Sequence, residues 1–313
     1  MELKQLKYFS AIVENGSFSK AADALHISQP SLSQQILNLE DELSTSLLVR
    51  SAAGVKATMA GEILHRHARQ MLRQAEAIRS DVLNVSAHLT GTVAVGFPTT
   101  IAAVLAVPLF EQVRTLYPGI RLQIFESMSG YVSEMLASGR LDIAVLFRTE
   151  ARRGTALMQL FDEWLYVIGN HPTLDDLDAT CPLSRLDNVP MVAPTPEVTL
   201  RVLITKAFER AGIELNIVAN IDSLNTMLEI VEKGSVCAIL PASSVVLRPS
   251  SNFTKRKIIE SEIMRPISVC WPASQPRSAA STAVCELIGL LFRDLHEKGE
   301  WEGVAKIYPR PVD

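Results

Sequence analysis

The chain has little cysteine, and its cysteines form no pair in the sequence. Cys181, Cys237, Cys270 and Cys285 stand far apart among 313 residues, without a C-x-x-C spacing. Zinc sites and redox motifs need such a spacing, and disulfide-rich secreted domains need more cysteines. We therefore expect buried thiols in a reducing compartment, with no metal site.

Long apolar runs are also missing. The opening segment MELKQLKYFSAIVENG has no run long enough for a signal peptide. No other stretch approaches the roughly 20 apolar residues that a membrane-spanning helix needs. We expect a cytoplasmic protein without a membrane partner. An exported solute-binding protein, one of the alternatives, would need an export signal.

The sequence lacks the common catalytic motifs. It contains no G-x-S-x-G, H-E-x-x-H, P-loop or G-x-G-x-x-G pattern, and its six histidines are scattered. Each of these patterns places a nucleophile, a metal or a phosphate in a defined geometry. We therefore expect no enzyme and no cofactor, although an enzyme that uses residues outside any motif stays open as an alternative.

The chain has no excess of basic charge. Its formal net charge is −4, its pI is about 5.9, and hydrophobic residues make up 48% of it. This composition predicts a globular protein, and the length of 313 residues predicts two or three domains. A nucleic-acid binder of this kind would depend on local charge placement, helix N-termini and more than one subunit.

One stretch, Ser17 to Arg50, predicts two helices joined at a tight corner. Ser17 or Ser19 can cap the first helix, and the corner falls at His26-Ile27. Ser28 can cap the second helix, with Pro30 in its first turn, where a missing amide proton has no cost. The apolar stripe of this second helix is Leu32, Ile36, Leu39 and Leu43.

The outward face of the second helix is uncharged and rich in amides and hydroxyls. Base edges in the major groove are read by such groups, and Gln or Asn suits adenine. An ordinary helical hairpin with a polar outside is the alternative, since similar pairs of helices are common. The residues of this face are Gln29, Ser31, Ser33, Gln34, Gln35 and Asn38.

These residues also carry a resemblance. The run AADALHISQPSLSQQILNLEDEL, followed by LLVR and GVKATMAG, strongly resembles the LysR-type transcriptional regulators. The opening MELKQLKYF is similar to the nitrogen-assimilation-control branch of that family, a likeness too local to assign a pathway. The resemblance implies a winged helix-turn-helix domain over residues 1–58, bound to double-stranded DNA at an inverted-repeat operator near promoters. It also implies a tetramer built as a dimer of dimers, and it leaves RNA polymerase open as a further partner.

The resemblance and the residue pattern together give the DNA-binding set. After the second helix, a short hairpin, the wing, carries Arg50 and Lys56 on its arms. The family often has Arg before the wing glycine, whereas this chain has Ala53, so the wing contact with the minor groove stays open. The expected DNA-binding residues are Lys20, Ser28, Gln29, Pro30, Ser31, Ser33, Gln34, Gln35, Asn38, Arg50 and Lys56.

Residues 59–89 predict one long linker helix. Its apolar residues alternate at steps of four and three, the heptad spacing of a helix–helix dimer. Packing against its own domain is the alternative. The expected dimer seam is Leu64, Ala68, Met71, Ala75, Ile78, Val82 and Val85.

From residue 90 to 313 strands and helices alternate, which predicts an α/β fold with a parallel sheet. We expect two lobes, lobe I over about 90–162 and 267–300 and lobe II over about 163–266. The tail from Gly299 shows no clear role. By resemblance this part is the effector-binding domain of LysR-type regulators, itself similar to type 2 periplasmic binding proteins.

Small molecules bind such sheets at the C-terminal ends of strands. Three predicted strand ends converge, and two of them offer hydroxyls before a helix N-terminus, which favours an anion. Arg148 is either a binding residue for a carboxylate, sulfonate or similar group or an ordinary surface arginine. Phe147 is either a core residue or a stacking partner. The expected effector-binding residues are Pro98, Thr99, Thr100, Phe147, Arg148, Thr195, Pro196 and Ser223.

Overall fold

A computed structural model describes residues 1–51, 54–83, 89–152, 154–247, 253–273 and 276–309 of the chain. The chain divides into two compact units. The first contains Met1–Gly91, and the second holds most of the chain from Thr92 onward.

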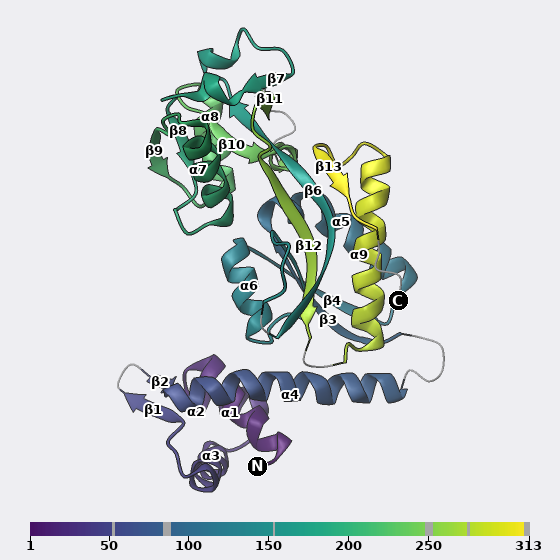
Figure 1. Ribbon diagram of the computed structural model, residues 1–313. Helices are drawn as coiled ribbons and strands as arrows, with labels where there is room; N and C mark the ends of the chain where they lie inside the picture. Colours follow the sequence, from purple (N-terminus) through teal and green to yellow (C-terminus); the bar gives the residue numbers. More distant parts are fainter. Residues whose placement is uncertain (52–53, 84–88, 153, 248–252, 274–275, 310–313) are drawn as a thin grey trace. The chain divides into compact units, whose positions relative to one another are not determined.

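The first unit is a helix-turn-helix with an additional helix before it and a hairpin after it (Figure 1). Ser17 caps α2 by accepting from the Lys20 amide, and Ser28 caps α3 by accepting from the Ser31 amide. Both caps satisfy an amide that a helix start leaves unpaired. The elements are α1 (Leu3–Asn15), α2 (Phe18–Leu25), α3 (Gln29–Leu43), β1 (Leu48–Ser51), β2 (Gly54–Ala57) and α4 (Met59–Leu83).

The core of the first unit is built from the apolar faces of α1, α2 and α3. Phe9, Leu32, Ile36 and Leu39 are all at most 1% exposed. The sequence prediction was wrong for Leu43, which is 39% exposed. Leu43 is the last residue of α3, beyond the point where the other helices cover its apolar stripe.

The wing, formed by antiparallel β1 and β2, is attached to the turn between α1 and α2. The Val55 amide donates to the Gly16 carbonyl at 2.9 Å. A Cβ on Gly54 would lie 2.8 Å from that same carbonyl oxygen, and Gly54 has φ of 113°. Only glycine fits this close approach.

The helix α4 has two different halves. Leu64 packs against the core of the first unit, and Ala68 is 1% exposed, so these seam positions are covered by their own chain. Met71, Ile78 and Val82 are 43%, 56% and 67% exposed. Ala75 lies between them and is half-buried. The last predicted seam residue, Val85, lies outside the described residues.

The second unit is a mixed sheet flanked by helices. In the described chain the strand order is β4-β3-β5-β12-β6-β11-β7, and β10 and β13 also pair with β6. Its strands are β3 (Gly91–Pro98), β4 (Ile120–Ser127), β5 (Ile143–Leu146), β6 (Thr155–Gly169), β7 (Thr180–Pro182), β8 (Met191–Ala193), β9 (Ile217–Asn220), β10 (Ala238–Pro241), β11 (Thr254–Ile259), β12 (Met264–Pro272) and β13 (Val304–Ile307). Its helices are α5 (Thr99–Leu116), α6 (Ser129–Ala137), α7 (Thr199–Ala211), α8 (Leu224–Glu232) and α9 (Ala279–Glu297), with short 3-10 turns η2 (Pro172–Leu174), η3 (Leu183–Leu186) and η4 (Ala242–Leu247).

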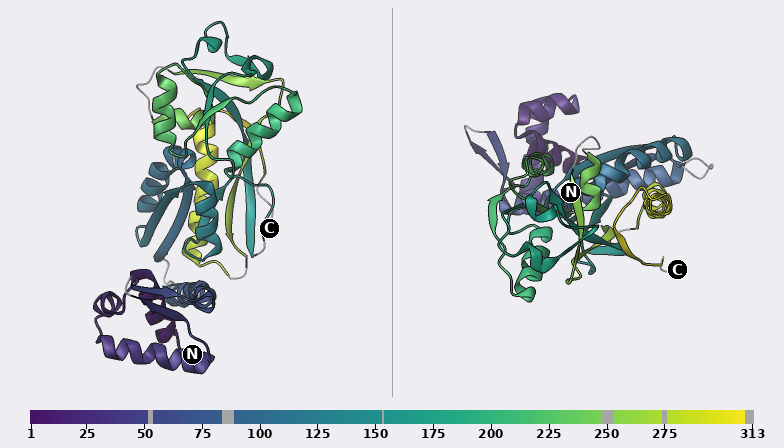
Figure 2. Two further views of the ribbon diagram at one scale, coloured as in Figure 1. Left: turned by 90° about the vertical axis from the view of Figure 1, so that its left-hand side faces the viewer. Right: turned by 90° about the horizontal axis from the view of Figure 1, so that it is seen from above.

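Two long strands connect the lobes of this unit. β6 and β12 pair antiparallel from Trp164↔Met264 to Thr155↔Pro272 and run from one lobe into the other (Figures 1 and 2). The parallel pairing of β3 with β5 agrees with the predicted parallel sheet, whereas β12 pairs antiparallel with β5 and makes the sheet mixed.

The C-terminal segment belongs to lobe I, so the prediction that it shows no clear role was wrong. Trp301 is 2% exposed, and its indole Nε1 donates to Glu163 Oε1 at 3.2 Å. β13 pairs with β6, and the Tyr308 hydroxyl donates to Asp162 at 2.8 Å. The indole packs on Phe161 and Phe292, so the segment closes one side of the lobe core.

Candidate functional site

The exposed face of α3 presents the predicted amides and hydroxyls. Gln29, Ser31, Gln34 and Asn38 are exposed, while Ser33 and Gln35 are half-buried. Pro30 is also exposed and lies in the first turn of α3, where Ser28 uses its hydroxyl as the cap.

Two amides on this face are already oriented. Gln34 Nε2 donates to Asn38 Oδ1 at 2.9 Å, one helical turn along. This bond uses one donor of Gln34 and one acceptor of Asn38, so each amide keeps a donor and an acceptor for a base edge. Glu40, the first acidic residue after them, accepts from the amides of Leu47 and Leu48 and is thereby tied to the start of the wing.

Arg50 links the wing to the helix-turn-helix. Its guanidinium NH2 donates to Ser33 Oγ at 3.1 Å, and its Cζ lies 4.1 Å from the centre of the Phe18 ring. The sequence predicted Arg50 and Ser33 as separate DNA-contacting residues, but not this contact between them. Lys20 on α2 and Lys56 on β2 are exposed, and Ala53 lies outside the described residues.

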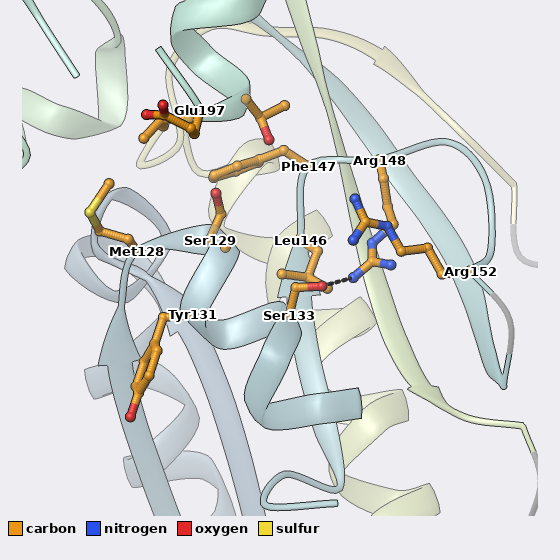
Figure 3. A pocket seen from close by; sticks show the side chains of 12 residues that line it. Met128, Ser129, Tyr131, Ser133, Leu146, Phe147, Arg148, Arg152 and Glu197 are labelled. Carbon is orange, nitrogen blue, oxygen red and sulfur yellow. Dashed lines mark hydrogen bonds between the residues drawn. The ribbon is translucent and has the colours of Figure 1, made fainter. Parts of the chain in front are cut away.

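The second unit contains a cavity of about 370 Å³ between its lobes (Figure 3). Small-ligand sites commonly have volumes of this order or larger. Of the predicted residues, Phe147 and Arg148 line it. Its walls are Met128, Ser129, Gly130, Tyr131, Ser133, Leu146, Phe147, Arg148, Arg152, Glu197, Val198 and Thr199.

A smaller cavity of about 80 Å³ lies next to it and shares Phe147 with it. Pro98, Thr99 and Thr100 line this second cavity, together with Pro194 and Asp222 from the other lobe. The segments that follow β3, β5 and β8 therefore meet at this cavity, although the predicted residues Thr195 and Pro196 do not line it.

Three predicted residues are not in the walls of either cavity. The Thr195 amide and hydroxyl both donate to Asp222, at 2.9 and 3.1 Å. Ser223 caps α8 by accepting from the Thr226 amide, and Pro196 is exposed. These hydroxyls therefore fix the local backbone, and Asp222 is the side chain that reaches the smaller cavity.

Sequence reasoning missed the α6 side of the larger cavity. Ser129 and Ser133 belong to α6, which follows β4, and Arg152 lies four residues after Arg148. The available signal was the end of β4, a fourth strand end before a helix. Arg148 NH2 donates to Ser133 Oγ at 3.0 Å. Burial lowers the pKa of the Arg148 guanidinium, and the nearby positive charge of Arg152 lowers it further.

A buried ion pair lies behind the smaller cavity and was also missed. Arg265, which lines that cavity, donates to Glu163 and to Thr100 Oγ1. Its Cζ lies 4.0 Å from the centre of the Phe147 ring. Arg265 therefore holds two cavity residues in place.

In the part of the chain that the structure describes, no group of His, Cys, Asp and Glu side chains could hold a metal ion. No described helix is long and apolar enough to cross a membrane.

Two family models match the sequence, one for each unit. Residues 3–62 match the bacterial regulatory helix-turn-helix protein of the lysR family, and residues 86–291 match the LysR substrate binding domain. Among curated proteins, the nitrogen assimilation regulatory protein nac of Escherichia coli K12 is 32% identical over 97% of this chain and 100% of its own length. The regulator BenM of Acinetobacter baylyi is 27% identical over 86% of this chain and 89% of its own length.

Solved structures share the fold over nearly the whole chain. A full-length OxyR variant from Pseudomonas aeruginosa has a TM-score of 0.74 at 24% identity, covering 94% of this chain and 95% of that one. CbnR in complex with its target DNA has a TM-score of 0.67 at 23% identity, covering 92% of this chain and all of that one. With a family model over most of its length and a relative above 30% identity, this chain belongs to the LysR family of DNA-binding transcriptional regulators, with an N-terminal helix-turn-helix domain and a C-terminal effector-binding domain.

Proposed function

We propose that α3 enters the major groove and reads base edges of an inverted-repeat operator. The carrying observation is the uncharged exposed face of α3, where Gln34 and Asn38 are held together and Arg50 is fixed beside Ser33. Amides suit base edges, and an arginine beside them suits a phosphate. CbnR, which shares the fold, has been solved on its target DNA.

The test is DNA footprinting on the region upstream of its own gene, followed by binding measurements on the protected site. Gln29→Ala should lower specific affinity about 5- to 150-fold, because a bidentate base contact contributes about 1–3 kcal/mol. Asp41→Asn, an exposed change at the far end of α3, is the matched control and should leave affinity unchanged. Equal affinity of Gln29→Ala and wild type would remove Gln29 from the reading face.

Arg50 and Lys56 are proposed to contact the DNA backbone. Such contacts release counterions, so each one contributes about 1 to the slope of log affinity against log salt concentration. Arg50→Gln should therefore weaken binding to all sequences similarly and reduce that slope by about 1. A change in sequence preference with an unchanged slope would indicate base reading instead.

Two copies of the reader are proposed to act together. Met71, Ile78 and Val82 leave an apolar stripe on the outer half of α4 that its own unit does not cover. A dimer through this stripe would hold two half-sites at once and compensate for the small basic charge of each reader. A dimer of dimers and a contact with RNA polymerase are further proposals that rest on the family alone.

We propose that an organic anion binds between the lobes and changes how the protein holds its operator. Arg148, Ser133 and the α6 start supply donors in one cavity. A ligand shifts the DNA-bound state only if its affinity differs between two domain arrangements. Footprints recorded with and without a library of anions test this step. A protection pattern that shifts with one compound supports it, and a pattern that no compound alters opposes it.

Two alternative functions, solute binding and catalysis, would use the same two-lobed domain. A solute-binding function does not account for the DNA-binding first unit. An enzyme would turn over its substrate, which a regulator of this family does not need to do. We propose that the protein is a cytoplasmic regulator, because its operator DNA lies in the cytoplasm. We also propose that it is not an enzyme and uses no cofactor. A turnover screen against the bound anion would reveal catalysis.

A further inference from the structure

Two arginines from one lobe lie on the same side of the larger cavity. Figure 3 shows the Arg148 and Arg152 side chains together at one side of the cavity, with the Arg148 guanidinium bonded to Ser133. Within the described ranges neither guanidinium forms an ion pair with a carboxylate. Arg152 bonds within the described chain only through its backbone, to Thr155.

Two guanidinium groups held near one another have an electrostatic cost. Like charges held near one another disfavour the charged form of each, which is part of the reason that the pKa of Arg148 is lowered. A bound group with a single negative charge would compensate one guanidinium. A group with two negative charges on adjacent oxygens would compensate both, through charge-assisted hydrogen bonds.

Neutral donors lie around the same end. Ser133 Oγ accepts from Arg148, so its own proton is available to a third group. The amides of Ser129 and Gly130 precede the first intrahelical bond of α6, from the Val132 amide to the Met128 carbonyl. Amides in a first helical turn lack intrahelical partners and favour an anion. All three residues line the cavity.

The opposite wall restricts the rest of the ligand. Glu197 lies across the cavity from the two arginines, beyond Phe147 (Figure 3). A long dicarboxylate would bring its second carboxylate toward Glu197, where two negative charges repel. Both negative charges of a favoured ligand must therefore lie at the arginine end. A cationic or uncharged group fits the end near Glu197.

We propose that this cavity binds a compact dianionic group, typified by phosphate or a phosphate monoester, through Arg148 and Arg152. A regulatory role for this cavity rests on the proposed function. Beyond that function, we assign the class of ligand, a binding role for Arg152, and discrimination by Glu197 against long dicarboxylates. A phosphate monoester is mostly dianionic above pH 7, because its second pKa is about 6.

The test is calorimetry and thermal unfolding of the full-length protein at pH 7.5 and constant ionic strength. The probes are inorganic phosphate, O-phosphoethanolamine, glutarate and acetate. Both phosphate probes should bind at least tenfold more tightly than glutarate or acetate. Tighter binding of O-phosphoethanolamine would identify a monoester with a cationic end, and tighter binding of inorganic phosphate would identify free phosphate; both results support the dianion site.

Arg152→Gln should weaken phosphate binding at least tenfold. Arg121→Gln, an exposed change on β4 outside the cavity walls, should leave it unchanged. Glu197→Gln should narrow the difference between phosphate and glutarate. Equal phosphate affinity of Arg152→Gln and wild type, tighter binding of glutarate, or no binding of either phosphate probe would overturn the proposal. Operator binding by the same protein samples is measured separately, without ligand. A wild-type protein that does not bind its operator would count against the proposed function, whereas the phosphate measurements test only the ligand class.

Discussion

Arg265 on β12 and Glu163 on β6 form a buried ion pair between the two strands that connect the lobes. Arg265 Nε lies 2.7 Å from Glu163 Oε2, and the two side chains are 3% and 0% exposed. The other carboxylate oxygen accepts from Ser243 and from Trp301. Glu163 thus has partners in both lobes and in the C-terminal segment, and Arg265 connects it to the cavity residues Thr100 and Phe147.

Removal of Arg265 alone should be strongly destabilising. Arg265→Met leaves the Glu163 carboxylate buried without its counter-charge, which typically costs about 3–5 kcal/mol. All three tryptophans, Trp164, Trp271 and Trp301, lie in the second unit, so their fluorescence during urea unfolding reports on that unit.

The matched control for this change is the double variant Arg265→Met, Glu163→Gln. It removes both charges and should recover much of the lost stability, because breaking one partner costs more than replacing both. If the double variant were as unstable as Arg265→Met, lost packing rather than an unpaired charge would be the cause.

The outer half of α4 gives a prediction on assembly. Ile78→Glu places a charge within the apolar stripe of Met71, Ile78 and Val82. We expect the dimer to dissociate in sedimentation experiments and operator affinity to fall at least about 100-fold, since two linked readers exceed one by about 10²–10⁴. Arg79→Glu, an exposed change on the flank, controls for charge. A dimeric Ile78→Glu protein would place the interface elsewhere.

The contact between α1 and α4 should depend on pH. Arg69 donates to Glu14 at 2.6 Å, and His65 lies 3.7 Å from the same carboxylate oxygen. The His65 contact, opposed by burial and aided by Arg69, lowers the pKa of Glu14 below its usual range. A carboxyl with a lowered folded-state pKa stabilises the fold above its unfolded pKa, and this contribution is lost as pH falls through the folded value.

Glu14→Gln should therefore reduce stability by about 0.5–1 kcal/mol at neutral pH, the size expected for a partly exposed pair. The difference from wild type should shrink as pH falls below about 4.3, the ordinary pKa of glutamate. Calorimetric unfolding across pH measures it, with Glu62→Gln on the exposed side of α4 as control. A difference that grows toward acid pH would contradict this sign.

The cysteines should be unreactive in the folded protein. Burial raises the pKa of Cys181 and Cys270 to about 11 and that of Cys237 to about 12, and Cys285 is also buried. The thiolate is the reactive form, so little of it exists near pH 8. A thiol reagent at pH 8 should label the native protein slowly and all four thiols after urea denaturation. Rapid labelling of one native thiol would disprove its burial.

The helix-turn-helix was predictable because its signals are local. Ser17 and Ser28 cap helices within three residues of themselves, and the stripe of Leu32, Ile36 and Leu39 lies within one helix. The reading face followed from the same periodicity. Leu43 failed because burial at a helix end depends on whether another element covers it, which the periodicity does not contain.

The missed features depend on partners far away in the chain. The strand β6 contains the polar residues Gln159, Asp162 and Glu163, which interrupt the apolar pattern expected of a buried strand. Glu163 is buried because Arg265 and Trp301, more than 100 residues later, satisfy its oxygens. The same holds for the larger cavity. The sequence alone does not show that the segments after β4 and β5 line the same cavity, so α6 could not be assigned to its wall.

The interleaved course of β6 and β12 has a consequence for how the chain is made. The first unit is formed almost entirely by Met1–Gly91, so the DNA reader is synthesised before most of the second unit. Lobe I instead starts with β3 and is complete only when β12, α9 and β13 have been added at the other end of the sequence. A chain that ends between residues 92 and 263 therefore contains Met1–Gly91 and lacks Arg265, the residue that holds Thr100 and Phe147 in the cavity. Under the proposed mechanism, such a fragment would retain the DNA-reading unit and lack the complete effector cavity.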